Sequence, residues 1–329
     1  MLFRSPSAPT RARRGSPPRS AANRPASGRG WVTLIVLALA AVVVSVGPGT
    51  IREIVSGVTF VRPPAASIPA PILHTEPTLQ AGVDGVSAAF SHGRLALAIV
   101  DLQSGATAGV DAERALPAAS LFKLPILLEV LTEEEAGRLD PDMRLAIRAE
   151  DWTDGSGVLQ GRVGDQLAVR ELTRLMIQQS DNIAALVLMD TVGLESVNGM
   201  AERLGMRATR LVDHRAGEPG DHTTSASDMA HLLTGLATGQ LVSQRVAEQA
   251  LSLLELRQSV SWLGDDLPFW VKVAHKWGDL PEARNDAGVV FTPRGSYAIA
   301  VLTENGLPDE SARAIARISR VVYDYLGNH

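Results

Sequence analysis

Lysine is rare in this chain, and its positions are the first indication of chemistry. The chain has 31 basic residues, of which only Lys123, Lys272 and Lys276 are lysines. Arginine stays protonated at ordinary pH, whereas a lysine that is buried or crowded by another cation can lose its proton. The retained lysines therefore indicate positions that need a titratable amine. The alternative is that codon bias favours arginine throughout the chain and that the three lysines remain by chance.

Ser120 precedes Lys123 by three residues, at the start of an apolar helical stretch. Residues i and i+3 share one face of a helix, so the lysine amine can reach the serine oxygen. The first turn of a helix also favours developing negative charge. A serine hydroxyl is activated when a neighbouring base takes its proton, and a desolvated lysine can be that base. Taken alone, the pair is common by chance and more typical of a helix cap followed by a solvated lysine.

Two further polar motifs follow along the chain. Residues 180–182 read Ser-Asp-Asn at the start of another apolar stretch, and all three residue types are also common helix caps. Residues 276–278 read Lys-Trp-Gly at the end of a predicted strand, where an edge-strand lysine with a turn glycine is the plain alternative. Each motif is weak alone, and the three together are more specific.

In this order, the three motifs resemble those of the class A β-lactamases and penicillin-binding proteins. The resemblance spans about residues 78–326 and includes Thr223-Thr224 before an apolar helix. It implies that Ser120 attacks a substrate carbonyl and becomes acylated, with Lys123 as base or proton relay. Ser180 would sit between the two lysines and pass a proton to the leaving nitrogen.

The resemblance also implies a set of substrate contacts. Asn182 would bond the acyl-amide side of the substrate. Lys276 would attract a substrate carboxylate and help to keep Lys123 unprotonated. The backbone N–H groups of Ser120 and Asp279, the latter directly after Gly278, would form an oxyanion hole, and such a donor contributes about 2.7–4 kcal/mol.

The loop between Leu211 and Thr223 departs from the family pattern, because it is short and lacks the Glu-x-x-Leu-Asn that holds the deacylating water. Glu218 precedes a proline, as the family glutamate does, and is the candidate base. An exposed loop acid is the alternative reading of Glu218. Weaker candidates in this loop are Asp213, His214 and His222.

Trp277 is the second departure, since the family has Ser or Thr at this position. A hydroxyl that would help to bind the substrate carboxylate is therefore missing. The indole is expected either to narrow and reshape the cleft or simply to pack between sheet and lobe. A loop at 152–157 is expected to be a plain turn or to form part of the rim of the cleft.

These residues need elements that bring them together. Alternating and helical periodicities predict strands before the Ser-x-x-Lys motif, helices after it and a strand meander near the C-terminus: helix 79–90, strand 95–101, helix 121–131, helices within 169–256, strands 269–277, 286–292 and 296–303, and helix 308–326. The predicted fold is α/β, an α+β sandwich. Its antiparallel sheet is flanked by N- and C-terminal helices and carries an inserted all-helical lobe, with a cleft between sheet and lobe.

The N-terminal region predicts a membrane topology. Residues 1–30 contain seven arginines and no acid, and residues 31–47 are almost entirely apolar. We expect a disordered cytoplasmic tail, a single transmembrane anchor, a Pro-rich linker at 48–77 and an extracytoplasmic catalytic domain at 78–329. A cleaved signal peptide, which would make the protein secreted, and a buried core helix are the alternatives.

Composition narrows the remaining classes. The chain has no cysteine, which excludes disulfides and thiolate chemistry, and its seven histidines lack metal-ligand spacing. No Gly-rich phosphate loop follows a strand. We therefore expect a monomer without metal, cofactor or nucleic-acid partner, acting on a β-lactam or a peptidoglycan-like substrate. The predicted function is β-lactam opening through a Ser120 acyl-enzyme that deacylates slowly. The alternatives are a peptidoglycan D,D-peptidase or other amidase or esterase, and a non-catalytic penicillin-binding sensor.

Overall fold

A six-stranded sheet is the centre of the fold. The computed structural model describes residues 72–327. Adjacent strands are antiparallel except for the short parallel pair β1–β3. The strands run in the order β1 (His74–Thr75), β3 (Ala106–Val110), β2 (Arg94–Asp101), β10 (Gly295–Glu304), β9 (Ala283–Thr292) and β8 (Lys272–Leu280). The last of these, β8, is therefore an edge strand.

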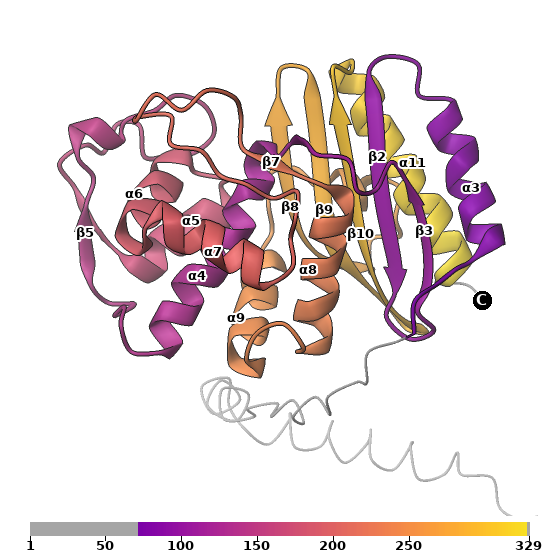
Figure 1. The fold of residues 1–329 in the computed structure, drawn as a ribbon, viewed down its shortest axis with the longest axis horizontal. Helices are drawn as coiled ribbons and strands as arrows, with labels where there is room; N and C mark the ends of the chain where they lie inside the picture. Colours follow the sequence, from indigo (N-terminus) through magenta and orange to yellow (C-terminus); the bar gives the residue numbers. More distant parts are fainter. Residues whose placement is uncertain (1–71, 328–329) are drawn as a thin grey trace, which may run out of the picture. The chain divides into compact units, whose positions relative to one another are not determined.

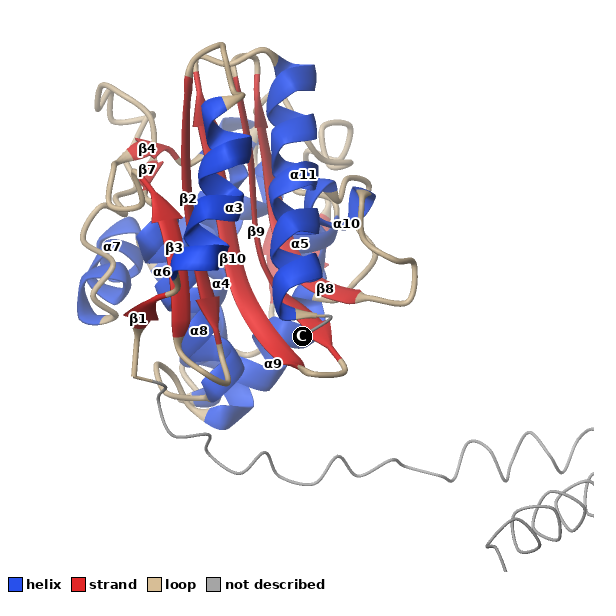
Figure 2. Cartoon of the chain, turned by 90° about the vertical axis from the view of Figure 1, so that its right-hand side faces the viewer, coloured by secondary structure: helices blue, strands red, loops and turns tan. Residues whose placement is uncertain are grey.

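Two terminal helices cover one face of this sheet, α3 (Pro77–Ala88) and α11 (Pro308–Leu326) (Figure 2). Each has a proline in its first turn, where a missing N–H costs nothing. Their apolar sides pack on the sheet in a core cluster that also contains Leu263 of the short helix α10 (Trp262–Asp265).

The helical lobe lies between β3 and β8 in sequence (Figure 1). Its core is continuous with the second face of the sheet, against which α8 packs. The lobe also contains two short strand pairs, β4 (Leu116–Pro117) with β7 (Thr223–Thr224) and β5 (Arg144–Ala146) with β6 (Gln166–Ala168). Its helices are η1 (Ala119–Phe122), α4 (Lys123–Glu135), η2 (Ala149–Asp151), α5 (Val169–Gln178), α6 (Asn182–Val192), α7 (Leu194–Arg203), α8 (Ala226–Thr238) and α9 (Gln244–Leu254).

This architecture confirms the predicted fold class, with small shifts at element ends. The strand expected at 269–277 begins at Lys272 and continues to Leu280. Phe269 and Trp270 lie outside it and are exposed. The apolar helix expected at 121–131 is divided into the 3₁₀ turn η1 and the helix α4, so that Ser120 lies in the turn.

The predicted tail, anchor and nearly all of the predicted linker lie outside the described residues. Within residues 72–327, no single helix is long and apolar enough to cross a membrane. Helices α6 and α7 pass that test only as a pair, and they bend by 84° where they meet. The predicted membrane topology stays a prediction.

Candidate active site

Ser120 lies in η1, one turn before the first residue of α4, and its side chain is nearly buried. The preceding residue, Ala119, has a φ of +45°, a left-handed conformation that is uncommon for a residue with a side chain. Such strain clusters at functional sites because the surrounding structure must enforce it. The Nζ of Lys123 lies 2.9 Å from the Ser120 Oγ.

Three other oxygens surround the Lys123 amine, at 2.6 Å (Ser180 O), 3.1 Å (Ser180 Oγ) and 2.7 Å (Asn182 Oδ1). An ammonium has three N–H donors, so it cannot serve four oxygens at once. When the amine is neutral, a serine hydroxyl can instead point its proton at the nitrogen. Burial and the nearby charge of Lys276 together hold the pKa of Lys123 well below its ordinary value. This amine can therefore act as a base.

Lys276 also contacts the Ser180 side chain. Its Nζ donates to the Ser180 Oγ at 3.0 Å and to the carbonyl of Trp277 at 2.7 Å. Burial lowers the pKa of Lys276 to about 7, and the charge of Asp286 partly opposes that shift. The Ser180 hydroxyl thus lies within hydrogen-bond distance of both lysines, and it connects two groups that can exchange a proton.

The two buried amines make stability depend on pH. The pKa of Lys276 is about 7 in the folded chain against an ordinary value of 10.5, so the unfolded chain binds more protons between these values. We therefore expect the free energy of unfolding in urea to rise from pH 7 to pH 9, with a limiting slope of about 1.4 kcal/mol per pH unit for each proton. Lys276→Met should flatten the rise, and Lys272→Met, at an exposed lysine, should leave it unchanged. A flat wild-type profile would contradict the prediction.

A loop after η2 packs against the Ser-Asp-Asn segment. The carboxylate of Asp181 accepts the N–H groups of Val158 and Leu159 at 2.6 and 3.0 Å, and it also caps α6. A Cβ on Gly157 would lie 2.2 Å from the same carboxylate, so only glycine fits there. The Asn182 amide donates to Asp154 O at 3.0 Å. The loop is therefore held by the same motif that carries Ser180, whose own φ is +52°.

The end of β8 lies directly against η1. A Cβ on Gly278 would come within 2.8 Å of both the Ala119 Cβ and the Ser120 nitrogen. Only glycine allows this approach, which brings the strand backbone next to the Ser120 N–H. Asp279 follows, and its carboxylate forms an ion pair with Arg284. This geometry is compatible with an oxyanion hole between the two backbones.

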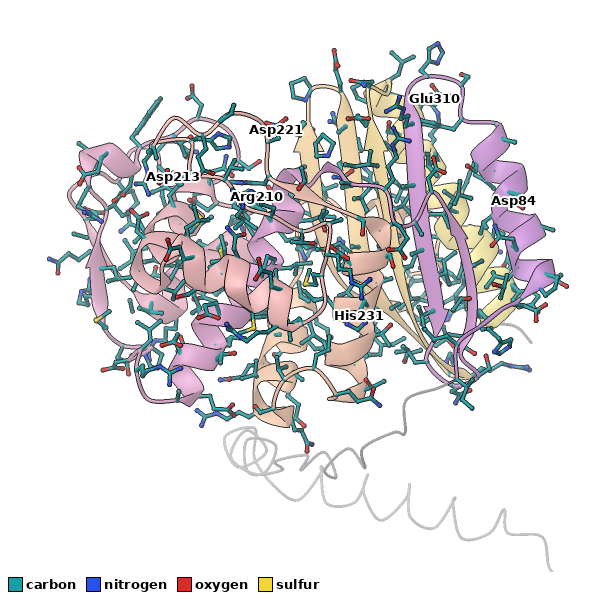
Figure 3. All side chains as sticks on the ribbon, viewed as in Figure 1. Asp84, Arg210, Asp213, Asp221, His231 and Glu310 are labelled. Carbon is teal, nitrogen blue, oxygen red and sulfur yellow. The ribbon has the colours of Figure 1, made fainter. Side chains whose placement is uncertain are left out.

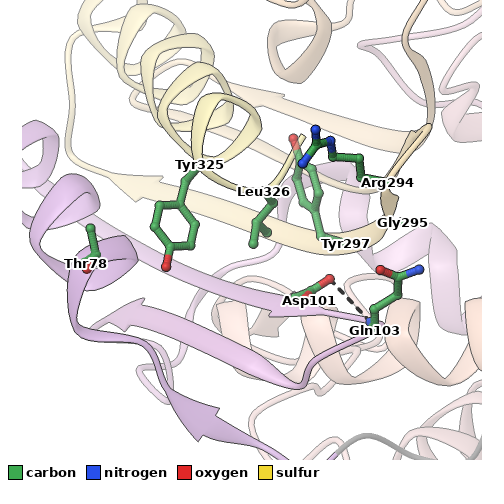
Figure 4. A pocket seen from close by; sticks show the side chains of 8 residues that line it. All are labelled: Thr78, Asp101, Gln103, Arg294, Gly295, Tyr297, Tyr325 and Leu326. Atoms are coloured by element: carbon green, nitrogen blue, oxygen red, sulfur yellow. Dashed lines mark hydrogen bonds between the residues drawn. The ribbon is translucent and has the colours of Figure 1, made fainter. Parts of the chain in front are cut away.

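A cleft of about 400 Å³ opens above Ser120. Its walls come from the 153–156 loop, the start of α6, the loop before β7 and the end of β8: Ala119, Ser120, Phe122, Thr153, Gly155, Ser156, Asn182, Leu186, His214, Asp221, His222, Asp279, Leu280 and Pro281. A larger hollow of about 720 Å³ lies between α3, α11 and the start of β10 (Figure 4). That hollow contains no motif residue, so the cleft at Ser120 is the candidate active site. Among residues 72–327, no cluster of three or more metal-ligating side chains occurs.

Comparison with known proteins agrees with this geometry. A family profile described as "Beta-lactamase enzyme family" matches residues 78–326. The chain belongs to this family. The predicted resemblance is thereby confirmed.

Individual relatives in the β-lactamase family are distant. A β-lactamase of Bacteroides uniformis is 29% identical over 234 residues, covering 63% of this chain and 78% of that protein. PBP-A is 27% identical with a TM-score of 0.74, covering 79% of this chain and all of PBP-A. A β-lactamase structure from Sphaerobacter thermophilus is 32% identical with a TM-score of 0.70, covering 76% of this chain and 98% of that chain.

Within this family fold, Glu218 does not line the cleft. Its carboxylate accepts the N–H of Asp213 at 3.1 Å and lies 3.8 Å from Arg210. Asp213 and Arg210 are labelled in Figure 3. These contacts match an exposed loop acid, the alternative reading of this residue, and they do not support Glu218 as a base. His214 and His222 do line the cleft, and so does Asp221, which sequence analysis missed although it directly precedes His222.

Trp277 and Lys276 both lie away from the described cleft walls. The indole is buried, packs edge-on against Trp262 of α10 with ring centroids 6.2 Å apart, and is absent from the cleft walls. The expectation that Trp277 narrows the cleft or packs against the lobe was therefore wrong. Lys276 is fully buried and also absent from the walls, and its implied attraction of a substrate carboxylate stays a prediction.

His222 presents a neutral ring. Burial, together with the charge of His214, lowers its pKa to about 4. Its Nδ1 accepts the N–H of Val212 at 3.1 Å, which leaves the ring proton on Nε2. At neutral pH this histidine can donate a hydrogen bond into the cleft, but it has no free nitrogen lone pair with which to take a proton from water.

Proposed function

We propose that this chain is a serine hydrolase that opens β-lactams through a Ser120 acyl-enzyme and releases the product slowly. The observation that carries the proposal is the 2.9 Å distance between the Lys123 Nζ and the Ser120 Oγ. The Lys123 amine is buried, and its pKa is well below the ordinary value. A desolvated amine at this distance meets the requirement for activating a serine.

The arrangement supports a complete acylation step. The Ser120 proton passes to Lys123 as Oγ bonds to the lactam carbonyl carbon. The C–N bond of the lactam then breaks, and the nitrogen takes the proton of the Ser180 hydroxyl. Ser180 recovers a proton from the ammonium of Lys123 or Lys276, both within 3.1 Å. Backbone N–H groups at Ser120 and Asp279 would hold the oxyanion.

Hydrolysis of the acyl-enzyme has weaker support. The cleft walls hold no glutamate among the described residues, and the neutral His222 ring has no free nitrogen lone pair. A missing general base slows such a step by roughly 10²–10⁴-fold. A related structure, a leucine-to-glutamate variant of PBP-A that is 28% identical to this chain, is an acyl-enzyme complex with penicillin G.

The test is intact-mass spectrometry of the chain mixed with penicillin G and followed over time. We expect the mass of one penicillin to be added per chain and to persist, with a burst of one opened ring per chain and weak turnover afterwards. Glu218→Gln should leave the adduct lifetime unchanged. A longer lifetime in that variant would restore Glu218 as the base. Rapid turnover without an adduct would contradict slow release, and no reaction at all would contradict acylation.

A peptidoglycan D,D-peptidase is the second candidate, favoured by the structural similarity to PBP-A and by the absence of a glutamate from the cleft lining within residues 72–327. Release of D-alanine from an acyl-D-alanyl-D-alanine peptide, lost in Ser120→Ala, would support it. A chain that is acylated but releases product from neither class of compound would instead act as a sensor.

A further inference from the structure

His222 brings an unused hydrogen-bond donor to the cleft at Ser120. Its Nδ1 accepts the N–H of Val212 at 3.1 Å, so the proton of the neutral ring is on Nε2. Among residues 72–327, no group accepts a hydrogen bond from this Nε2, and the ring is only partly buried. Polar groups in folded proteins are normally paired with protein or water, so this N–H is available to a ligand or to a water molecule.

Two contacts hold the His222 ring beside the nucleophile. The His222 carbonyl accepts the N–H of Ala118, two residues before Ser120, at 2.7 Å. The imidazole packs on the ring of Phe122, two residues after Ser120, with ring centroids 4.3 Å apart. His222 and Ser120 also line the same cleft. The position of the donor is therefore fixed by contacts with the residues that flank the serine on both sides in sequence.

The ring stays uncharged at neutral pH. Burial, followed by the charge of His214, lowers the pKa of His222 to about 4, and the charge of Lys123 acts in the same direction. The imidazole can therefore donate through Nε2, but it has no lone pair with which to act as a base. The contribution of Lys123 also indicates that its amine lies near the ring.

Water is the acceptor that this donor fits best. The described lining of the cleft contains no glutamate, so an attacking water needs other groups to hold it and to take its proton. The His222 N–H can hold the oxygen of such a water, and the neutral Lys123 amine can accept the proton. The reacting carbonyl of the substrate is already assigned to the N–H groups of Ser120 and Asp279.

We propose that the Nε2–H of His222 holds the water that hydrolyses the Ser120 acyl-enzyme. The inference rests on the proposed acylation of Ser120 and names a residue on which the slow release depends. The water oxygen bonds to the acyl carbon while one water proton passes to Lys123. The C–Oγ bond then breaks, and the Ser120 Oγ takes that proton from Lys123. His222 gains and loses no proton, and its contribution is the orientation of the water.

The experiment separates the two ring nitrogens by amide substitution. In His222→Asn the side-chain oxygen can replace Nδ1 and accept the Val212 N–H, but the amide nitrogen does not extend to the position of Nε2. In His222→Gln the amide nitrogen can replace Nε2, and the bond to Val212 is lost. His222→Phe keeps a ring against Phe122 and removes both nitrogens.

Intact mass of the full chain with penicillin G gives the acylation rate, and the loss of adduct after removal of free penicillin gives the adduct lifetime. We expect His222→Asn and His222→Phe to lengthen the lifetime by about 5- to 10-fold, the usual effect of one hydrogen bond, and His222→Gln to change it by less than about 2-fold. Acylation should be unchanged in all three variants. Where no adduct accumulates, the turnover rate is the same readout and should fall by the same factor.

A purely structural role would give the reverse order, because His222→Asn keeps the bond to Val212 and His222→Gln loses it. Melting temperatures report on the fold, and His92→Gln, at an exposed histidine before β2, is the control that should alter neither rate. A lifetime unaltered in His222→Phe, or restored by Asn and not by Gln, would overturn the proposal. Slower acylation with an unchanged lifetime would also overturn it, because the donor would then contact penicillin G. A wild type that is neither acylated nor opens penicillin G would overturn the proposed function itself.

Discussion

Ser120→Ala is expected to form no adduct with penicillin G and to lose turnover by about 10³-fold or more, as enzymes do when the nucleophile is removed. No other serine in the cleft has the same environment. Ser156 also lines the cleft, but the described contacts of the Lys123 amine are with Ser120, Ser180 and Asn182. The measurement is intact mass after incubation with the antibiotic, and Ser156→Ala is the matched control that should still be labelled.

The fold should survive this change. Ser120→Ala removes one of four oxygens around the Lys123 amine and leaves the other three in place. A melting temperature close to that of the wild type would separate loss of the nucleophile from loss of structure. A well-folded Ser120→Ala protein that gains the mass of penicillin would remove Ser120 from its proposed role.

Lys123→Arg is expected to slow acylation by roughly 10²–10⁴-fold, the usual contribution of a positioned general base. A guanidinium keeps its proton at ordinary pH and cannot accept the one that Ser120 must lose. Lys123→Met removes the amine without adding a charge to the buried site, and it should lose as much. Rates of adduct formation at saturating penicillin G measure the effect.

The other two lysines serve as comparisons. Lys272→Arg changes an exposed residue at the start of β8 and should leave acylation unchanged. Lys276→Arg keeps a donor for Ser180 and should lose less than Lys123→Arg. Equal losses at Lys123 and Lys276 would contradict the division of roles between a base and a donor.

Residue types and their spacing predicted much of the candidate site. The rarity of lysine, the i, i+3 relation of Ser120 and Lys123, and the order of the three motifs indicated the candidate catalytic set and the family. These signals are local or depend only on order along the chain.

The alternation of side chains along a strand also carried information that the prediction did not use. Because Lys276 and Trp277 are neighbours in β8, their side chains start from opposite faces of the sheet, so that Lys276 meets Ser180 and Trp277 meets Trp262.

Other features could not have been predicted because they arise between residues far apart in the sequence. The separation between Asp181 and Val158, whose contact holds the 153–156 wall, is 23 residues, and that between Lys276 and Ser180 is 96. The position of Glu218 depends on contacts with Arg210 and Asp213 that its own proline context does not encode. The sequence therefore predicted Glu218 as a base, whereas the folded loop places its carboxylate outside the cleft lining.

The sequence by itself determined the fold class, the family and the candidate serine and lysines, because these depend on periodicity, residue chemistry and motif order. Only the tertiary structure decided how these charged groups are buried and paired. Burial lowers the pKa values of Lys123 and Lys276, whereas Asp221 and Asp279 lie on the cleft walls. Solvent exposure and the distance between charges set these electrostatic properties, and both quantities exist only once the chain has folded.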